Sequence, residues 1–286
     1  MKLYIHAGTH KTATSSFQRL CHENRKLLIT HQIFYPDFSS ILPSVNHGII
    51  GRLIYENNID GAKNLIKAIT KKAATTNCNQ ILLSSELLEN CLIDYNFAKS
   101  FWDVIQQGEF EATVWSYTKR NGFDYLNSLY SQLSTNKGIS IDYDYASSHI
   151  VSQGYYCISD QFHPKYYVFD INRRIELLRA IIRPTALEIQ SFEKFTEGFP
   201  GKSLIARIVP GNSVCIEALE KCSKLIDKLA CSLSPVEIEE NYLRNFLRIA
   251  NNSLPEDEIL IRNLIRRRLK IKSQAQRKWK DRLLAI

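Results

Sequence analysis

The chain has 286 residues, of which 44% are hydrophobic and 23% are charged, and its formal net charge is +8. This length favours one large domain or two small ones, and a chain of this size buries roughly 70 to 75% of its unfolded surface without metal or disulfide staples. No stretch approaches the roughly 20 apolar residues of a membrane span, and a strand pattern begins at Lys2, so we expect a cytoplasmic protein.

The cysteines and histidines disfavour two further classes of protein. The seven cysteines are odd in number and include no C-x-x-C pair, which favours reduced thiols over a disulfide framework or a zinc knuckle. His6 and His10 form an H-x-x-x-H pattern, but they lie across a strand and a loop and not on one helix face. We therefore expect no metal site.

Strand and helix patterns alternate along the chain. Short runs rich in apolar or β-branched residues predict strands at 3–7 (LYIHA), 80–84 (QILLS), 111–118 (EATVWSYT) and 202–208 (KSLIARI). Helical periodicity follows the first and third of these runs and recurs near 60–76, 94–107, 170–182, 213–230, 235–250 and 256–283. This alternation predicts an α/β fold of three layers, with helices flanking a central, mostly parallel sheet.

A hydroxyl-rich stretch follows the first predicted strand. Residues 8–16 read GTHKTATSS and open a helix, where backbone N–H groups and the helix dipole favour an anion. Lys11 adds a charge, and further donors come from the hydroxyls of Thr12, Thr14, Ser15 and Ser16. The stretch predicts a phosphate-binding loop; the simpler alternative is a Thr/Ser-capped helix with a surface lysine.

The spacing of this loop differs from that of nucleoside triphosphatases. The Walker A motif has four residues between its first glycine and a G-K-[ST] ending. Here only Thr9 and His10 separate Gly8 from Lys11, and no second glycine precedes the lysine. A wide loop around the β-phosphate of ATP is therefore disfavoured, and a shorter loop that grips one terminal phosphate is favoured.

A second candidate anion site follows the third predicted strand, in residues 117–133 (YTKRNGFDYLNSLYSQL). Arg120 stands at the carboxyl end of that strand, and Ser128 comes eight residues later in the next helix. An arginine fork and a hydroxyl can together hold a second phosphate. Asn121 and Asp124 lie where acceptor side chains satisfy the first N–H groups of a helix. A strand-end arginine that caps its own helix is the simpler alternative.

Together these motifs resemble the sulfotransferases that use 3′-phosphoadenylyl sulfate (PAPS), especially bacterial members and relatives of the Golgi carbohydrate enzymes. Residues 11–15 (KTATS) match the Lys-[Thr/Ser]-Gly-Thr-Thr core of the family's 5′-phosphosulfate loop, and Arg120 with Ser128 matches its 3′-phosphate motif. The fragments FYPD (34–37), NHG (46–48) and ILLSSE (81–86) are also similar. The resemblance covers the chain from its start to the region of residue 135. Ala13 replaces the family's usual glycine. A glycine there lets the backbone approach the phosphate closely or take a positive φ.

The resemblance implies a P-loop-like sulfotransferase fold and transfer of a sulfuryl group from PAPS to a hydroxyl of a glycan, glycolipid or small metabolite. The product would be 3′-phosphoadenosine 5′-phosphate (PAP), and no metal is implied. Lys11 would stabilise the departing phosphate, and Arg120 with Ser128 would hold the 3′-phosphate. The 5′-phosphate would be held by the rest of the loop: Gly8, His10, Thr12, Ala13, Thr14, Ser15 and Ser16. For the base that the acceptor hydroxyl needs, His47 is the first candidate and Glu86 the second.

The positive charge is concentrated near the end of the chain. Residues 262–282 contain ten Lys and Arg against the single acid Asp281, so this stretch carries more than the whole net charge. Leu264, Ile265, Leu269 and Ile271 predict a basic amphipathic helix suited to an anionic bilayer or a polyanionic acceptor, although a solvated helix face explains the same charges. We expect a sulfotransferase-like domain at 1–255, a basic helical extension at 256–286 and no specific nucleic acid partner.

Two other functions compete with the sulfotransferase. A P-loop kinase-like phosphotransferase is disfavoured by the missing Walker glycine and by the lack of a context for Mg²⁺ ligands. A catalytically degenerate family member could instead bind anionic surfaces through its basic tail.

Overall fold

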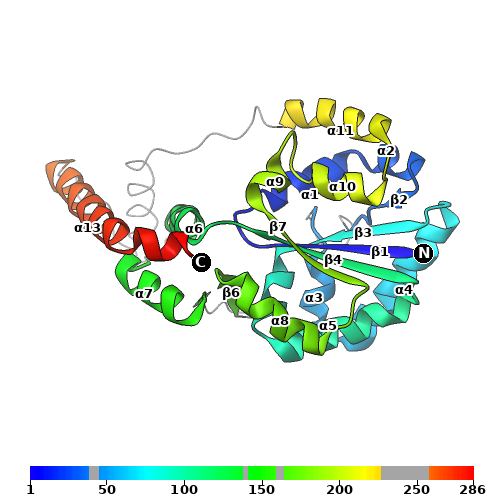
Figure 1. The fold of residues 1–286 in the computed structure, drawn as a ribbon, viewed down its shortest axis with the longest axis horizontal. Coiled ribbons are helices and arrows are strands. Elements are labelled where there is room, and N and C mark those ends of the chain that lie inside the picture. The colour runs from blue at the N-terminus through cyan, green and yellow to red at the C-terminus, as the bar shows by residue number, and fades with distance from the viewer. Residues whose placement is uncertain (39–44, 138–140, 159–163, 227–257) are drawn as a thin grey trace. The chain divides into compact units, whose positions relative to one another are not determined.

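The computed structural model describes residues 1–38, 45–137, 141–158, 164–226 and 258–286 (Figure 1). The chain divides into two compact units. Unit 1 comprises Met1–Lys119 and Cys157–Leu229, and unit 2 comprises Arg120–Tyr156 and Ala230–Ile286. The helix expected at 235–250 and the domain boundary expected at residue 255 lie outside the described residues.

Unit 1 is built on a five-stranded sheet in the order β2-β3-β1-β4-β7, and all of its pairings are parallel. The strands are β1 (Lys2–Gly8), β2 (Ile33–Phe34), β3 (Gln80–Ser84), β4 (Ala112–Lys119) and β7 (Ala186–Ser191). The predictions of a central parallel sheet and of strands at 3–7, 80–84 and 111–118 are confirmed. β1 occupies the centre, and its residues from Leu3 onward are buried.

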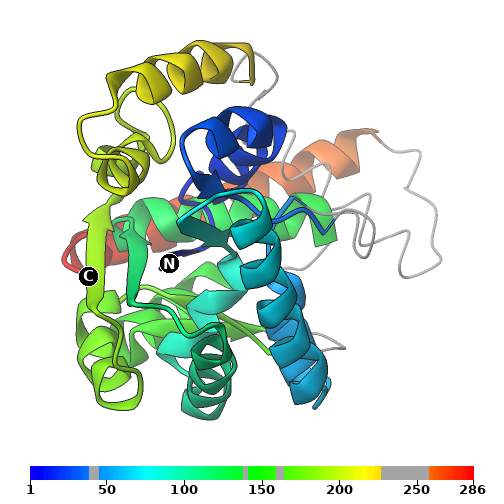
Figure 2. The same cartoon turned by 90° about the vertical axis from the view of Figure 1, so that its right-hand side faces the viewer.

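Helices cover both faces of this sheet (Figures 1 and 2). One face carries α1 (Thr14–Glu23), α2 (Arg25–Thr30), α9 (Phe192–Thr196), α10 (Lys202–Ile208) and α11 (Ser213–Ile226). The other carries α3 (Gly48–Tyr55), α4 (Ile59–Thr75), α5 (Tyr95–Ile105) and α8 (Ile171–Ile181). Two short 3₁₀ helices, η1 (Glu86–Leu92) and η2 (Gln106–Gly108), flank α5 in the chain. The three-layer prediction is confirmed for this unit.

The strand predicted at 202–208 is wrong, because these residues form the helix α10. Leu204, Ile205 and Ile208 are buried together, at the spacing of one helix face. The N-cap of this helix is Gly201, which has a φ of 86°. The Gly201 backbone approaches the Phe17 ring so closely that a Cβ would lie 2.2 Å from it. The strand at the edge of the sheet beside β4 is β7, and the two strands pair in parallel.

The order of the strands creates a switch point at the centre of the sheet. The chain leaves β1 toward β2 on one side, whereas the chain that leaves β4 returns to the sheet as β7 on the other side. In open α/β sheets, ligands bind outside the carboxyl ends of the strands where the connections diverge in this way. The loop after β1 lies at such an end.

Unit 2 consists mainly of α6 (Gly122–Lys137), α7 (Tyr143–Gln153) and α13 (Glu258–Leu284). The basic helix α13 contacts both α6 and α7. Its buried side chains are Ile265, Ala275, Trp279 and Leu283. Among the residues expected to face a bilayer, Ile265 is therefore buried, whereas Ile271 is exposed.

The remaining strands, β5 (Tyr155–Ile158) and β6 (Lys165–Val168), form a separate two-stranded sheet where the chain returns to unit 1. Among the described residues, no helix combines the length and the apolar composition needed to cross a membrane.

Candidate functional site

The candidate site is the β1–α1 loop, residues 9–13, together with the first turn of α1. β1 ends at Gly8, where a Cβ would lie 2.0 Å from Thr14 Oγ1 and 2.9 Å from the ring of His6. Only glycine therefore lets the start of α1 pack over the end of β1. The prediction that residues 8–16 follow a strand and open a helix is confirmed, because β1 ends at Gly8 and α1 begins at Thr14.

Two residues of the loop have left-handed backbone conformations. The φ of Lys11 is 62°, and Ala13, the N-cap of α1, has a φ of 60° and a ψ of 18°. A left-handed conformation costs a residue with a side chain about 1 to 2 kcal/mol. Ala13 thus adopts a conformation that favours glycine. Its side chain is partly buried and packs against a hydrophobic core to which α1 contributes Phe17 and α10 contributes Leu204.

The threonine hydroxyls of the loop stabilise the loop itself. Thr12 Oγ1 donates to the Thr9 carbonyl at 2.6 Å and lies 3.2 Å from Thr14 Oγ1, and all three side chains are buried. Thr9 Oγ1 donates to the Thr118 carbonyl of β4 at 2.9 Å, which ties the loop to the neighbouring strand. A hydroxyl has one hydrogen to donate, and Thr12 uses it to shape the loop. The other two hydroxyl residues are more accessible: Ser15 is exposed on α1, and Ser16 is half-buried.

Backbone donors are present at the same place. The first turn of an α-helix leaves N–H groups without a partner inside the helix, and Ala13 provides no side-chain cap for them. Three residues of α1 that belong to the predicted phosphate loop, Thr14, Ser15 and Ser16, contribute these groups. The arrangement suits an anion, because the N–H groups and the positive end of the helix dipole act together.

Glu86 lies beside the first turn of α1. It begins η1, two residues after the end of β3, and its carboxylate accepts hydrogen bonds from Ser15 Oγ at 3.2 Å and from Gln18 Nε2 at 3.0 Å. Gln18 Nε2 also lies 3.2 Å from Ser84 Oγ. Two residues predicted separately, Ser15 and Glu86, are thus brought into direct contact.

A second carboxylate, that of Glu89, holds the loop and was not predicted. It is fully buried, and it accepts hydrogen bonds from the backbone N–H groups of His10, at 2.8 Å, and of Val168. The His10 ring lies beside Tyr167, with 5.0 Å between their centroids. An acid within the apolar run LLENCL could have indicated this role. A carboxylate in such a run is expected to be buried, and a buried charge needs hydrogen-bond donors.

His47 is placed differently from the loop residues. It is buried at the N-cap of α3, where its Nδ1 accepts from the Ser84 N–H at 2.8 Å and its Nε2 lies 3.1 Å from the Pro36 carbonyl. This pattern requires the neutral tautomer with hydrogen on Nε2, which donates to Pro36. Burial lowers the pKa of His47 to about 4. Both ring nitrogens are therefore engaged with the backbone.

His6 is a core residue of β1. It is fully buried, with Nδ1 2.9 Å from Ser84 Oγ and Nε2 3.3 Å from Thr118 Oγ1, and its ring stacks on Phe195 at 4.8 Å between centroids. Burial lowers its pKa to about 3. Across the described ranges, no three His, Cys, Asp or Glu side chains gather as a metal site would require.

Arg120 and Ser128 belong to unit 2. Arg120 follows Lys119, the last residue of β4, and Ser128 lies within α6, half-buried. Asn121 Oδ1 accepts from the backbone N–H of Asp124 at 2.9 Å, so the prediction that Asn121 provides an acceptor at the start of this helix is confirmed.

No model of a protein family matches this chain, and neither a curated protein nor a solved structure matches it.

Proposed function

We propose that the protein is a sulfotransferase with a P-loop-like sulfotransferase fold, which transfers a sulfuryl group from PAPS to a hydroxyl of a glycan, glycolipid or small metabolite. The observation that carries the proposal is the β1–α1 loop. It lies at the carboxyl end of the central strand, and Ala13 takes a left-handed conformation at the position of the glycine in the motif it resembles. The alternatives, a P-loop kinase-like phosphotransferase and a binder of anionic surfaces, gain no comparable support from this loop.

The 5′-phosphosulfate would lie at the start of α1. Backbone N–H groups there, with the Ser16 hydroxyl, would hold the phosphate, and Lys11 would neutralise charge on the bridging oxygen. The Ser15 hydroxyl donates to Glu86, so it would join them only by exchanging that hydrogen bond for one to the phosphate. Ala13 is partly buried and packs against the hydrophobic core. Arg120 and Ser128 would hold the 3′-phosphate; this assignment rests on the resemblance of their motif.

Glu86 is better suited than His47 to act as the base. The Glu86 carboxylate is half-buried and lies 3.2 Å from Ser15, at the proposed phosphate site. His47 is buried, and its Nδ1 already accepts from the Ser84 backbone. A base must reach the proton that it removes within about 2.6 to 3.2 Å or through one water. We therefore assign proton abstraction to Glu86 and a structural role to His47.

The proposed reaction is an in-line transfer. The acceptor oxygen forms a bond to sulfur while the bond between sulfur and the 5′-phosphate oxygen breaks, and the acceptor proton passes to Glu86. The electron pair of the broken bond stays on the phosphate of PAP, where Lys11 and the start of α1 stabilise the charge. Because the carboxylates of Glu86 and Glu89 also contact this region, binding depends on Lys11 and the N–H groups outweighing their repulsion.

The test is transfer of radiolabelled sulfate from PAPS to a panel of glycans and hydroxylated metabolites, with EDTA present. We expect turnover in EDTA, because no metal takes part, and a loss of at least 100-fold for Lys11→Ala. The matched control is Lys67→Ala, which removes an exposed lysine from α4 on the opposite face of the sheet. Equal activity of the two variants, or turnover of ATP that requires Mg²⁺, would contradict the proposal.

A further inference from the structure

One side of α13 carries exposed basic side chains that make no ion pair. Within residues 265–284 of this helix, these side chains belong to Arg266, Arg267, Lys270, Arg277 and Lys280, and none of them pairs with an acid in the part of the chain that the structure describes. We call these five side chains the basic face. The same stretch of sequence contains a single acid, Asp281, which is also exposed. This side of unit 2 is therefore strongly positive.

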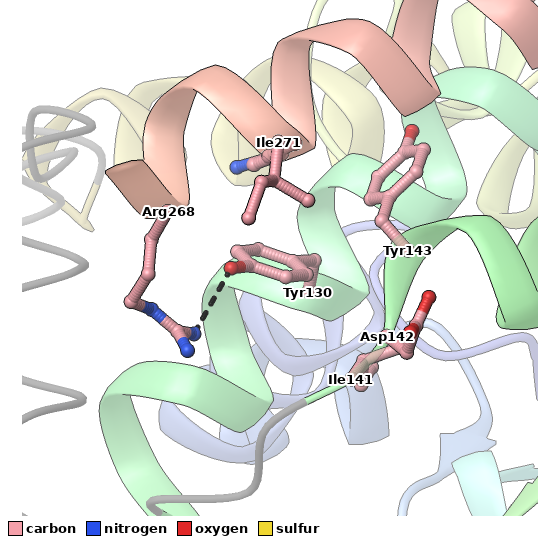
Figure 3. Close-up of a pocket in the computed structure, with 7 residues that line it drawn as sticks. Tyr130, Ile141, Asp142, Tyr143, Arg268 and Ile271 are labelled. Carbon is pink, nitrogen blue, oxygen red and sulfur yellow. Dashed lines mark hydrogen bonds between the residues drawn. The ribbon is translucent and has the colours of Figure 1, made fainter. Parts of the chain in front are cut away.

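Three other basic side chains of α13 are engaged with α6 and α7. Arg268 Nη2 donates to Tyr130 OH of α6 at 3.3 Å (Figure 3), and Lys272 Nζ lies 4.1 Å from the centroid of the same ring. Lys278 Nζ donates to the Asp144 carboxylate of α7 at 2.9 Å. These contacts hold α13 in unit 2, and the basic face does not take part in them.

The apolar side of α13 is already used inside unit 2. Ile265, Ala275, Trp279 and Leu283 are buried, and the helix contacts both α6 and α7. At 3.6 residues per turn, these positions lie on the side opposite the basic face. An isolated amphipathic helix binds a bilayer by burying its apolar side in the interface. Because that side of α13 is covered, a partner of the basic face must be bound mainly through charge.

The centre of the basic face is a straight row that ends in an aliphatic side chain. Arg266, Lys270, Arg277 and Leu284 follow one another at intervals of four, seven and seven residues. Helix geometry places them within about 40° of one another around the axis and along about 27 Å of its length. Leu284 is 45% exposed, so the row presents an apolar group beside its cations.

The breadth of the basic face and its apolar end favour one kind of anionic partner. Arg267 and Lys280 lie on either side of the row, so the cations spread over about 140° of the helix circumference. A broad face suits a flat array of anions better than a single strand of phosphates. A nucleic acid backbone offers only phosphate and sugar to Leu284, whereas a bilayer offers anionic headgroups and, just below them, an apolar layer.

We propose that the basic face of α13 binds the surface of a bilayer rich in anionic lipids, with the helix axis parallel to that surface. The five cations contact the lipid headgroups, and Leu284 enters the interface at the end of the row. Asp281 opposes binding, because it repels the same headgroups. The proposal goes beyond sulfuryl transfer and does not depend on it.

The test is co-sedimentation of the full chain with two kinds of vesicle, one of phosphatidylcholine alone and one in which about a third of the lipid is phosphatidylserine. We expect at least tenfold tighter binding to the anionic vesicles in 0.1 M salt. Most of this difference should disappear in 1 M salt, because the screening length falls from about 10 Å to about 3 Å.

Variants of the row locate the binding surface. The triple variant Arg266→Gln, Lys270→Gln and Arg277→Gln should bind the anionic vesicles at least twentyfold more weakly, since each Lys or Arg near such a surface contributes about fivefold. Leu284→Ser should weaken binding at least threefold. Glutamine is a good helix former, and circular dichroism checks that each variant is folded.

The matched control is a triple variant of three exposed lysines on α4, in which Lys67, Lys71 and Lys72 become glutamine. It changes the charge of the protein by the same amount and should alter vesicle binding less than twofold. Four results would overturn the proposal: equal binding to both kinds of vesicle, equal weakening by the two triple variants, undiminished binding of Leu284→Ser, or tighter binding to a DNA duplex than to anionic vesicles at equal phosphate concentration.

Discussion

The carboxylate of Glu86 accepts a hydrogen bond from Ser15 Oγ at 3.2 Å, and this contact joins the end of β3 to the first turn of α1. It places a base beside a helix start that is suited to a phosphate. A carboxylate at this position also stabilises the helix start when no ligand is bound. The contact therefore links proton transfer and anion binding at one place, and variants of the two residues separate these effects.

Replacing Glu86 with glutamine removes the base and its negative charge while keeping the size of the side chain. We expect turnover to slow about 100-fold or more, because general bases contribute roughly 10²- to 10⁴-fold. Affinity for PAP should stay equal or rise, because a like charge near the phosphate is lost. Steady-state kinetics and PAP calorimetry measure the two effects. Glu23→Gln, at the far end of α1, is the control and should leave both unchanged. Undiminished turnover in Glu86→Gln would refute the assignment.

Replacing His47 with glutamine should affect stability more than turnover. The imidazole satisfies the Ser84 N–H and the Pro36 carbonyl, both buried, and each lost partner costs about 1 to 3 kcal/mol. We expect a lower free energy of unfolding in urea, with turnover per folded molecule within about threefold of the parent protein's. If turnover instead slows at least 100-fold while PAP affinity is retained, His47 is the base.

Acid should destabilise the fold through two buried histidines. Burial lowers the pKa values of His6 and His47 from 6.5 to about 3 and about 4, so below pH 6.5 the unfolded chain binds more protons than the folded one. Stability is then complete above about pH 6.5 and declines as the pH falls toward 4, by up to about 1.4 kcal/mol per pH unit for each histidine. Urea unfolding between pH 7 and 4.5 measures this slope. His47→Gln should roughly halve it, and an unchanged slope would contradict the account.

Replacing Ala13 with glycine tests the strained position in the loop. Relief of about 1 to 2 kcal/mol is offset by about 0.5 to 1 kcal/mol of chain entropy and about 0.8 kcal/mol of lost methyl burial. We expect a net change in stability of less than about 1 kcal/mol and PAP affinity within about threefold, because the loop already has the required backbone. Chemical unfolding and calorimetry provide the two values. A tenfold gain in PAP affinity would show that the methyl group obstructs the phosphate.

The sequence predicted the parts of the fold whose patterns are local. Residues 80–84 form β3 as predicted, because an apolar run bounded by polar residues suits a buried parallel strand. Residues 202–208 do not form the predicted strand, because a short apolar run fits either a strand or a buried helix. The close approach of Gly201 to Phe17 is a tertiary contact, which the local pattern does not reveal. β7 was missed because, at the edge of the sheet, its residues are only partly buried and its pattern is weak.

The part of the candidate site formed by consecutive residues could be predicted from the sequence. The loop after β1 could be placed from a strand, a glycine and a run of hydroxyl residues. The contacts of Glu89 with His10 and Val168 join residues 79 positions apart in each case, and no spacing in the sequence indicates them. The conformation of Ala13 likewise depends on the packing of α1 over β1, so the sequence alone could not predict whether its φ is positive.

The central claim is that the β1–α1 loop binds the 5′-phosphate of PAP, and calorimetric titration of the full chain with PAP tests it most directly. We predict binding in EDTA, an accompanying rise in melting temperature, and at least a tenfold loss of affinity for Lys11→Ala but not for Lys67→Ala. At a hundredfold excess of ligand over Kd, binding adds about 2.7 kcal/mol of stability. No binding at millimolar PAP, or binding that Lys11→Ala leaves unchanged, would contradict the account.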